Sequence, residues 1–144
     1  MNSENEEKSL VNLGGLSLKT VVRTKDYNAS RDFYHQILNL KIVEEYSSEN
    51  RGCVFRFGHK DNNAFIEISE IKEGHYYYNS SFSKEVANDK IDLQLKTTDI
   101  MRWVNHLEGK WETIGPVDRP WGSRYLYLRD PDGLQIIIYE EKEI

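Results

Sequence analysis

The chain of 144 residues has few of the features that would identify its function directly. Its one cysteine excludes an internal disulfide and makes a reducing, cytoplasmic location the default expectation. No apolar run approaches the roughly 18 residues of a membrane helix, so we expect no membrane partner. The net charge of −5 comes without a basic stripe, which argues against a nucleic-acid partner. Glycine-rich phosphate loops, the serine nucleophile elbow and the H-E-x-x-H zinc motif are also missing.

The clearest local pattern is a β-hairpin near the C-terminus. Residues 123–129 alternate between two faces, with Tyr125 and Tyr127 on one of them, and residues 134–140 are rich in β-branched side chains. Between the two segments lies Asp130-Pro131-Asp132-Gly133. Pro fixes φ, Asp bonds to nearby backbone and Gly accepts a positive φ, so this segment predicts the turn.

The order strand, helix, strand, strand, strand is predicted twice. In the first copy a helix capped by Asn28 or Ser30 is combined with strands at 16–24, 41–46, 53–57 and 64–70. In the second copy a helix capped by Thr98 or Asp99 is combined with strands at 90–96 and 111–117 and the hairpin. We expect a disordered leader at 1–13 and one domain at 14–144, made of module one (15–71), a connector (72–89) and module two (90–141).

Two βαβββ modules predict an α+β fold whose mixed sheet forms an open, curled cup with the helices on its outside. The inner face of the cup would carry alternate residues of each strand, and most of these are polar. They include Lys19, Arg23, Glu67, Asp92, Gln94 and Tyr139. A polar inner face is typical of a ligand cup, and the alternative is an ordinary solvated sheet face.

Several motifs resemble one known superfamily. Residues 26–34 (DYNASRDFY), the segment Pro120-Trp121-Gly122 and the turn Asp130-Pro131-Asp132-Gly133 are similar to those of the vicinal-oxygen-chelate superfamily. It contains glyoxalase I, extradiol dioxygenases, fosfomycin-resistance enzymes and bleomycin-resistance proteins. The resemblance covers nearly all of the ordered chain, and is closest to the glyoxalase-like and bleomycin-resistance branches. It implies a small-molecule site and a homodimer, but fold alone does not fix function.

Enzymes of this superfamily hold a divalent metal ion at four inward positions. The resemblance places them at Lys19, Glu67, Asp92 and Ile137, and only Glu67 is of the usual ligand type. A charged lysine has no acceptor atom, and isoleucine has no ligand atom at all. We therefore expect no metal and no other cofactor. Instead, the Lys19 ammonium is expected to bridge Glu67 and Asp92, because buried charges require partners.

The remaining candidate residues are aromatic, basic or sulfur-containing. In the bleomycin-resistance branch the region of Trp121 borders the binding groove, so this resemblance makes Trp121, Arg124, Tyr125, Tyr127 and Tyr139 candidate ligand-binding residues. Core packing is the alternative for Trp121. The single cysteine, Cys53, falls in a predicted strand and is expected to be a buried structural thiol. The four histidines, His35, His59, His75 and His106, are expected to be exposed to solvent.

Three functions are compatible with these features. The first is a metal-free small-molecule-binding protein like the bleomycin-resistance proteins, which would sequester an aromatic or cationic compound such as an antibiotic. The second is a glyoxalase-like lyase or isomerase, or a dioxygenase, with a degenerate divalent-metal site around Glu67 and Asp92 and with Glu67 as ligand or general base. The third is an association domain that makes contact through residues 75–78. Whether the protein is an enzyme stays open, and the metal positions favour a non-enzyme.

Overall fold

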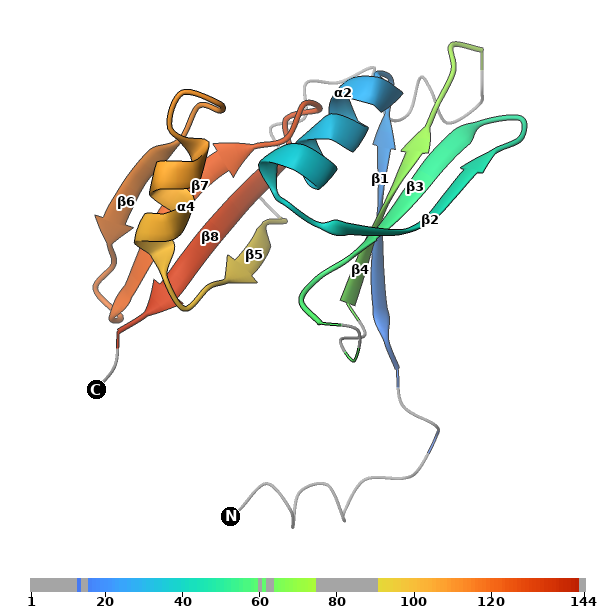
Figure 1. Cartoon of the computed structure of the whole chain (residues 1–144). Helices are drawn as coiled ribbons and strands as arrows, with labels where there is room; N and C mark the ends of the chain where they lie inside the picture. The colour runs from blue at the N-terminus through green and yellow to red at the C-terminus, as the bar shows by residue number, and fades with distance from the viewer. Residues whose placement is uncertain (1–12, 14–15, 60, 62–63, 75–90, 143–144) are drawn as a thin grey trace.

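The computed structural model describes residues 13, 16–59, 61, 64–74 and 91–142. The predicted leader lies almost entirely outside these residues, as does most of the predicted connector, including His75. The described chain forms two open four-stranded sheets with short helices, side by side in Figure 1. Among its helices none is long and apolar enough to cross a membrane.

Module one begins with strand β1 and continues through a helix into three further strands. Its elements are β1 (Leu18–Thr24), α2 (Tyr27–Asp32), the π-helical turn η1 (Phe33–Ile37), β2 (Lys41–Ser47), β3 (Arg51–Arg56) and β4 (Ala64–Glu70). The strand order in the sheet is β1-β4-β3-β2. β1 runs parallel to β4, and the other neighbours are antiparallel.

Module two repeats this topology. Its elements are β5 (Leu93–Lys96), α4 (Ile100–Leu107), β6 (Ile114–Asp118), β7 (Ser123–Arg129) and β8 (Gln135–Glu141). The strand order is β5-β8-β7-β6, with β5 parallel to β8 and the other pairs antiparallel. The predicted α+β fold of two βαβββ modules is therefore confirmed, as is the C-terminal hairpin.

One of the two helix caps differs from the prediction. The carboxylate of Asp26 accepts a hydrogen bond from the Ala29 N–H at 3.1 Å, so Asp26, rather than Asn28 or Ser30, caps α2. Ser30 lies inside the helix and is buried, with its hydroxyl 2.7 Å from that of Thr24. In the second helix Asp99 accepts from the Arg102 N–H at 3.3 Å and caps α4 as predicted.

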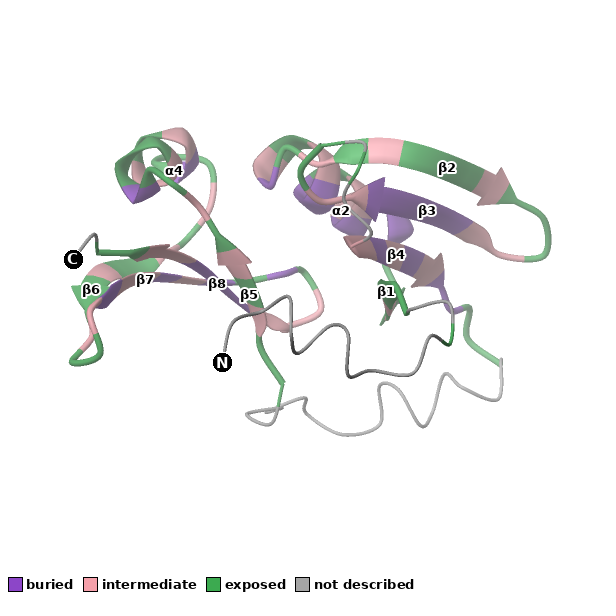
Figure 2. Cartoon of the chain, turned by 90° about the horizontal axis from the view of Figure 1, so that it is seen from below, coloured by how far each residue is buried: buried purple, intermediate pink, exposed green. Residues whose placement is uncertain are grey.

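The apolar faces of both sheets contribute to one hydrophobic core, into which both helices also pack. Its buried members are Tyr27, Phe33, Tyr34, Leu38, Cys53, Phe55, Ile66, Ile68, Ile100, Leu107, Leu126, Leu128, Ile136 and Ile138. Figure 2 shows that burial is greatest on the central strands β3, β4, β7 and β8, whereas the edge strands are largely exposed. Each fully buried aliphatic or aromatic side chain contributes about 1.5–3 kcal/mol to the free energy of unfolding.

Helix α2 and the π-helical turn η1 that follows it also link module one to module two. Phe33 packs on Trp111 of module two, with 4.8 Å between their ring centroids. The Tyr34 hydroxyl donates to the buried Asp130 carboxylate at 2.7 Å, and the Ser30 hydroxyl donates to Asp132 at 3.1 Å. The predicted turn therefore does more than connect two strands, because its acidic side chains bind the helix of the other module.

Burial raises the pKa of the Asp130 carboxyl, while the hydrogen bond from Tyr34 opposes this shift. Two backbone N–H groups, of Asp132 at 2.9 Å and of Leu134 at 2.8 Å, complete its hydrogen bonding. Burial, together with the neighbouring Asp130 charge, raises the pKa of Tyr34 well above its usual range. The pair therefore lies in an environment where an unpaired charge would be costly.

Cys53 is fully buried on β3, and burial raises the pKa of its thiol to about 11, so the predicted structural thiol is confirmed. Two of the four histidine predictions are wrong. His106 Nε2 lies 2.9 Å from the Ile37 carbonyl oxygen, and His35 Nδ1 lies 3.1 Å from that of Leu40. Both are half-buried and hydrogen-bonded, whereas His59 is exposed as expected.

Replacing Tyr34 with Phe should destabilise the protein by about 1–3 kcal/mol at neutral pH, because a buried carboxylate loses a hydrogen-bond donor. The pKa of Asp130 is raised in the folded protein, so its protonated form is favoured there. The contribution of Asp130 to the free energy of unfolding is therefore favourable at acidic pH and is lost as pH rises through the raised pKa. Without the opposing bond from Tyr34 that pKa rises further, so the penalty should shrink as pH falls. Urea denaturation at neutral and acidic pH measures both effects.

The control for this experiment is Tyr125→Phe. The Tyr125 hydroxyl makes a long 3.5 Å hydrogen bond to Gln94 in an exposed position. Its loss should cost less than about 0.5 kcal/mol at either pH. Equal penalties for the two substitutions, or a Tyr34→Phe penalty that does not vary with pH, would contradict the structural role assigned to the pair.

Candidate functional site

The face of each sheet that is turned away from the common core, here called its free face, carries most of the predicted site residues. On the free face of module one the Lys19 ammonium donates to Glu67 at 2.9 Å. The Tyr46 hydroxyl donates to the other oxygen of the same carboxylate at 3.0 Å. Glu67 is 15% exposed in its side chain and Lys19 is 49% exposed. These three residues form the Lys19–Glu67–Tyr46 network.

Sequence reasoning missed Tyr46, although a signal for it exists. Gly52 pairs with Tyr46 between β3 and β2, and a Cβ atom at position 52 would overlap the Tyr46 ring. A glycine inside a strand often marks a place where another group approaches closely. Gly52 thus provides the space that lets the Tyr46 ring lie across the sheet and reach Glu67.

The predicted bridge from Lys19 to both acidic residues forms only in part. Lys19 contacts Glu67, but Asp92 accepts a hydrogen bond from the Gln135 side-chain amide at 2.9 Å within module two. The pKa of Lys19 is raised, first by its hydrogen bond to Glu67, and Asp92 is not among the causes. Lys19 and Glu67 are therefore paired within module one, and Asp92 is paired within module two.

The four positions at which the resemblance predicts a metal site do not fit a divalent cation. Lys19 places an ammonium on Glu67, and the fourth position, Ile137, is buried and apolar. In the part of the chain that the structure describes, no three His, Cys, Asp or Glu side chains converge as a metal site. Borderline metals require imidazole or several convergent carboxylates, which this donor set does not provide.

The free face of module two carries four aromatic rings, here called the aromatic cluster, in which one ring contacts each of the other three. Tyr125 lies at its centre, with ring centroids 5.7 Å from Trp121, 5.9 Å from Tyr127 and 6.1 Å from Tyr139. Trp121 is 60% exposed, so it is not a core residue. The structure thus brings together four of the predicted ligand-binding residues, with Gln94 hydrogen-bonded to Tyr125 beside them.

Arg124 lies on the opposite side of β7 from this cluster. Side chains alternate along a strand, so Arg124 shares a face with the buried Leu126 and not with Tyr125. Its guanidinium contacts Asp118 at 3.2 Å. The prediction that Arg124 belongs to the groove is not supported by its position. Arg23, in contrast, is exposed on β1, in the same alternation as Lys19.

A hollow of about 840 Å³ adjoins the aromatic cluster, and we call it the β6–β7 hollow. It shares Tyr127 with the cluster, and a second lining residue, Arg119, stacks on Trp121 with 4.8 Å between the guanidinium carbon and the ring centroid. The other lining residues are Lys110, Trp111, Glu112, Ile114, Leu128, Arg129 and Gln135. Arg119 and Arg129 were not predicted, although Arg119 stands only two residues before Trp121.

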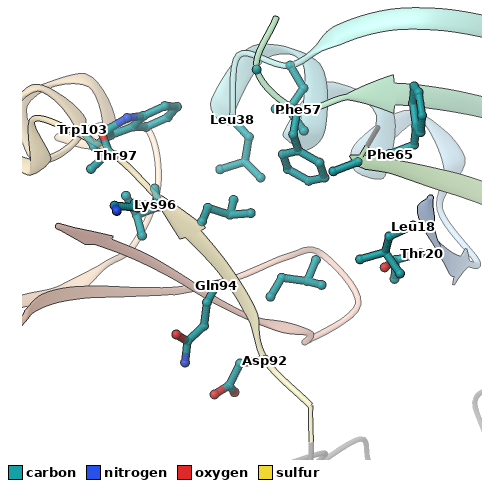
Figure 3. A pocket seen from close by; sticks show the side chains of 16 residues that line it. Leu18, Thr20, Leu38, Phe57, Phe65, Asp92, Gln94, Lys96, Thr97 and Trp103 are labelled. Carbon is teal, nitrogen blue, oxygen red and sulfur yellow. The ribbon is translucent and has the colours of Figure 1, made fainter. Parts of the chain in front are cut away.

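A second hollow, of about 510 Å³, lies between the two modules. Leu38 and Phe57 project into it from module one and Trp103 from module two (Figure 3). Asp92 and Gln94 point to the other side of β5 (Figure 3). This hollow has mainly apolar walls, and both charged residues that line it have partners: Asp92 accepts from Gln135 at 2.9 Å and Lys96 is paired with Glu141 at 3.1 Å. It therefore offers shape but few polar groups that could orient a ligand.

Comparison with known proteins agrees with this architecture. Residues 17–138 match the family model described as the Glyoxalase/Bleomycin resistance protein/Dioxygenase superfamily, and the chain belongs to this superfamily. No curated protein sequence matches it. Similar solved structures include TnmS3, an antibiotic binding protein from Streptomyces sp. CB03234, at 19% identity and a TM-score of 0.66, with 90% of this chain and 98% of that chain covered.

A glyoxalase I and a fosfomycin resistance protein show the same fold. Glyoxalase I from Leishmania major has a TM-score of 0.68 at 15% identity, covering 89% of this chain and 88% of that chain. The fosfomycin resistance protein FosX from Listeria monocytogenes has a TM-score of 0.64 at 17% identity, covering 90% and 95%. At such identities the likeness establishes the fold and leaves the chemistry to the residues of the site.

Replacing Glu67 with Gln should lower the pKa of Lys19, because it removes the carboxylate charge and leaves only an uncharged amide oxygen to accept the hydrogen bond, and these two effects of Glu67 are the largest causes of the upward shift. NMR titration of the lysine side chains measures the change. Lys96 is a matched control, since its pKa is raised by Glu141 in module two. The pKa of Lys96 should stay unchanged in the Glu67→Gln variant and should fall in the Glu141→Gln variant. An unchanged Lys19 pKa in Glu67→Gln would show that the network does not form in solution.

Proposed function

We propose that this protein binds a planar aromatic small molecule without a metal ion and without transforming it chemically. The aromatic cluster carries this proposal. Tyr125 contacts three further rings on this sheet face, and the largely exposed Trp121 is the ring on which a planar ligand would stack. The β6–β7 hollow beside them has the volume of a typical small-molecule site.

The likeness in fold to an antibiotic binding protein supports sequestration as the role of this site. An antibiotic with fused rings would suit the aromatic cluster. The charges near the cluster do not favour the cationic ligand considered from the sequence, because the side chain that stacks on Trp121 is a guanidinium.

The enzymatic alternative has weaker support. Lyases, isomerases and dioxygenases of this superfamily would use a metal at the position where this chain places the Lys19 ammonium. Glu67 as a general base would also need to be accessible, yet both of its oxygens accept hydrogen bonds, from Lys19 and Tyr46. Binding without catalysis requires neither a metal nor a free Glu67.

The binding test uses Trp121→Ala in protein treated with a chelator. Neutral planar aromatic compounds, including anthraquinones, should bind the wild type, and the variant should lose about tenfold in affinity, because one stacking partner is worth about 0.5–1.5 kcal/mol beyond its buried area. Isothermal titration calorimetry measures both affinities. Trp103→Phe, a change in the inter-module hollow, is the control and should leave the affinity unchanged.

Two results would contradict the proposal. Binding that disappears on chelation and returns with Ni²⁺, Zn²⁺, Mn²⁺ or Fe²⁺ would make the protein a metalloprotein with an unusual donor set. Equal affinities for wild type and Trp121→Ala would place the site away from the aromatic cluster.

We also propose that the protein is a homodimer in which module one of one copy faces module two of the other. The Lys19–Glu67–Tyr46 network and the aromatic cluster lie on different sheets, and among the described residues no hydrogen bond or ion pair joins them. The edge strand β1 exposes Leu18 and Val21, which a second copy would cover.

Sedimentation velocity should give the mass of two chains of 17.0 kDa each at micromolar concentration. Val21→Lys should shift the protein toward the monomer, because a charge would be buried at the contact, whereas Met101→Lys on α4 should not. A wild-type monomer that still binds the aromatic probes would refute the dimer alone. A cytoplasmic location is part of the same proposal and fits the buried thiol of Cys53.

A further inference from the structure

The charge of the β6–β7 hollow is opposite to that of the whole chain. Three basic side chains, those of Lys110, Arg119 and Arg129, line it against the single carboxylate of Glu112. The whole chain carries a net charge of −5. A local excess of positive charge in a concave site raises the concentration of anions there and favours an anionic occupant.

Arg119 is held in this hollow with its hydrogen-bonding capacity incompletely used. Its Nε atom is buried, and within the described part of the chain no acceptor bonds to it. No described carboxylate lies within ion-pair distance of its guanidinium, whereas Arg124 nearby contacts Asp118. The Arg119 guanidinium instead stacks on Trp121. Because no described carboxylate pairs with this guanidinium, a ligand carboxylate that reached its terminal N–H groups would form a strong, charge-assisted hydrogen bond.

Arg129 adds a second positive charge that no described acidic side chain neutralises. Its Nη1 donates to the Gly133 carbonyl at 2.8 Å, and its Nη2 donates to the Gln135 side-chain oxygen at 3.2 Å. Both acceptors are uncharged, so they orient the guanidinium and leave its charge in place. The hollow thus has a positioned cation on the wall formed by β7 in addition to Arg119.

Resting on the proposed function, we infer that the ligand of this site is a planar aromatic acid. Its ring system stacks on the aromatic cluster, and its carboxylate is bound by the guanidinium of Arg119, with Arg129 contributing charge. The planar fork of an arginine matches a carboxylate through two parallel hydrogen bonds. Because Arg119 also contacts Trp121, one residue joins the stacking surface to the anion site.

The experiment compares three probes that share one ring system and differ in charge. An anthraquinone carboxylate, the corresponding carboxamide and the corresponding methylamine are titrated into the full-length protein by isothermal titration calorimetry. The carboxylate should bind at least tenfold more tightly than the carboxamide, and the methylamine should bind most weakly. High salt should weaken binding of the carboxylate and leave that of the carboxamide nearly unchanged.

The variants separate the charge of Arg119 from its shape. Arg119→Gln should reduce the affinity for the carboxylate about tenfold and change that for the carboxamide less than about twofold. Arg119→Lys keeps the charge but lacks the planar fork of arginine. Its affinity for the carboxylate should therefore lie between that of the wild type and that of Arg119→Gln. Arg102→Gln removes the same charge from the exposed face of α4 and should have no effect.

The outcomes distinguish this inference from the function on which it rests. If the carboxamide binds in a Trp121-dependent way but the carboxylate binds no more tightly, the anion site is wrong and the aromatic-binding function stands. If no probe binds, both are wrong. If Arg119→Gln fails to fold, Arg119→Lys and the salt dependence of the wild type decide the matter. An equal loss for carboxylate and carboxamide in either variant would assign Arg119 a structural role only.

Discussion

The carboxylate of Asp130 is the constraint on which the arrangement of the two modules depends. It is 4% exposed and accepts hydrogen bonds from the Tyr34 hydroxyl and from two backbone N–H groups of its own turn. A charged group so deeply buried must keep its donors. The turn between β7 and β8 is therefore fixed against η1, and the sheets of both modules meet the same core. The direction of each free face follows from this contact.

The two free faces carry different chemistry as a result. In module one the Lys19 ammonium contacts the Glu67 carboxylate, and both oxygens of that carboxylate accept hydrogen bonds. In module two the corresponding face presents aromatic rings beside a basic hollow. A fold shared by enzymes and binding proteins can thus change function through a few side chains, while the helices, turns and core that position them are retained.

Local patterns in the sequence were sufficient to predict the helices and strands. They were insufficient to predict which residues of different elements contact one another. The bounds of β4 and β7 were predicted correctly because side-chain alternation is decided within each strand. Arg124 was assigned to the groove because the resemblance to the bleomycin-resistance branch places this region at the groove border, although the same alternation places Arg124 on the other face. The bridge from Lys19 to Asp92 required the relative position of two sheets, which depends on tertiary contacts such as that of Tyr34 with Asp130. The role of Arg119 also emerged only from the hollow around it.

The single thiol of the chain has a practical consequence. Cys53 lies on β3, between β2 and β4, and its pKa of about 11 leaves very little thiolate near neutral pH. A thiol reagent can reach Cys53 only when the strands of module one separate. The rate at which Cys53 is modified therefore measures local opening of that sheet. Site-specific labelling is possible without removing Cys53, since a second cysteine introduced on the surface would react much faster than the buried Cys53.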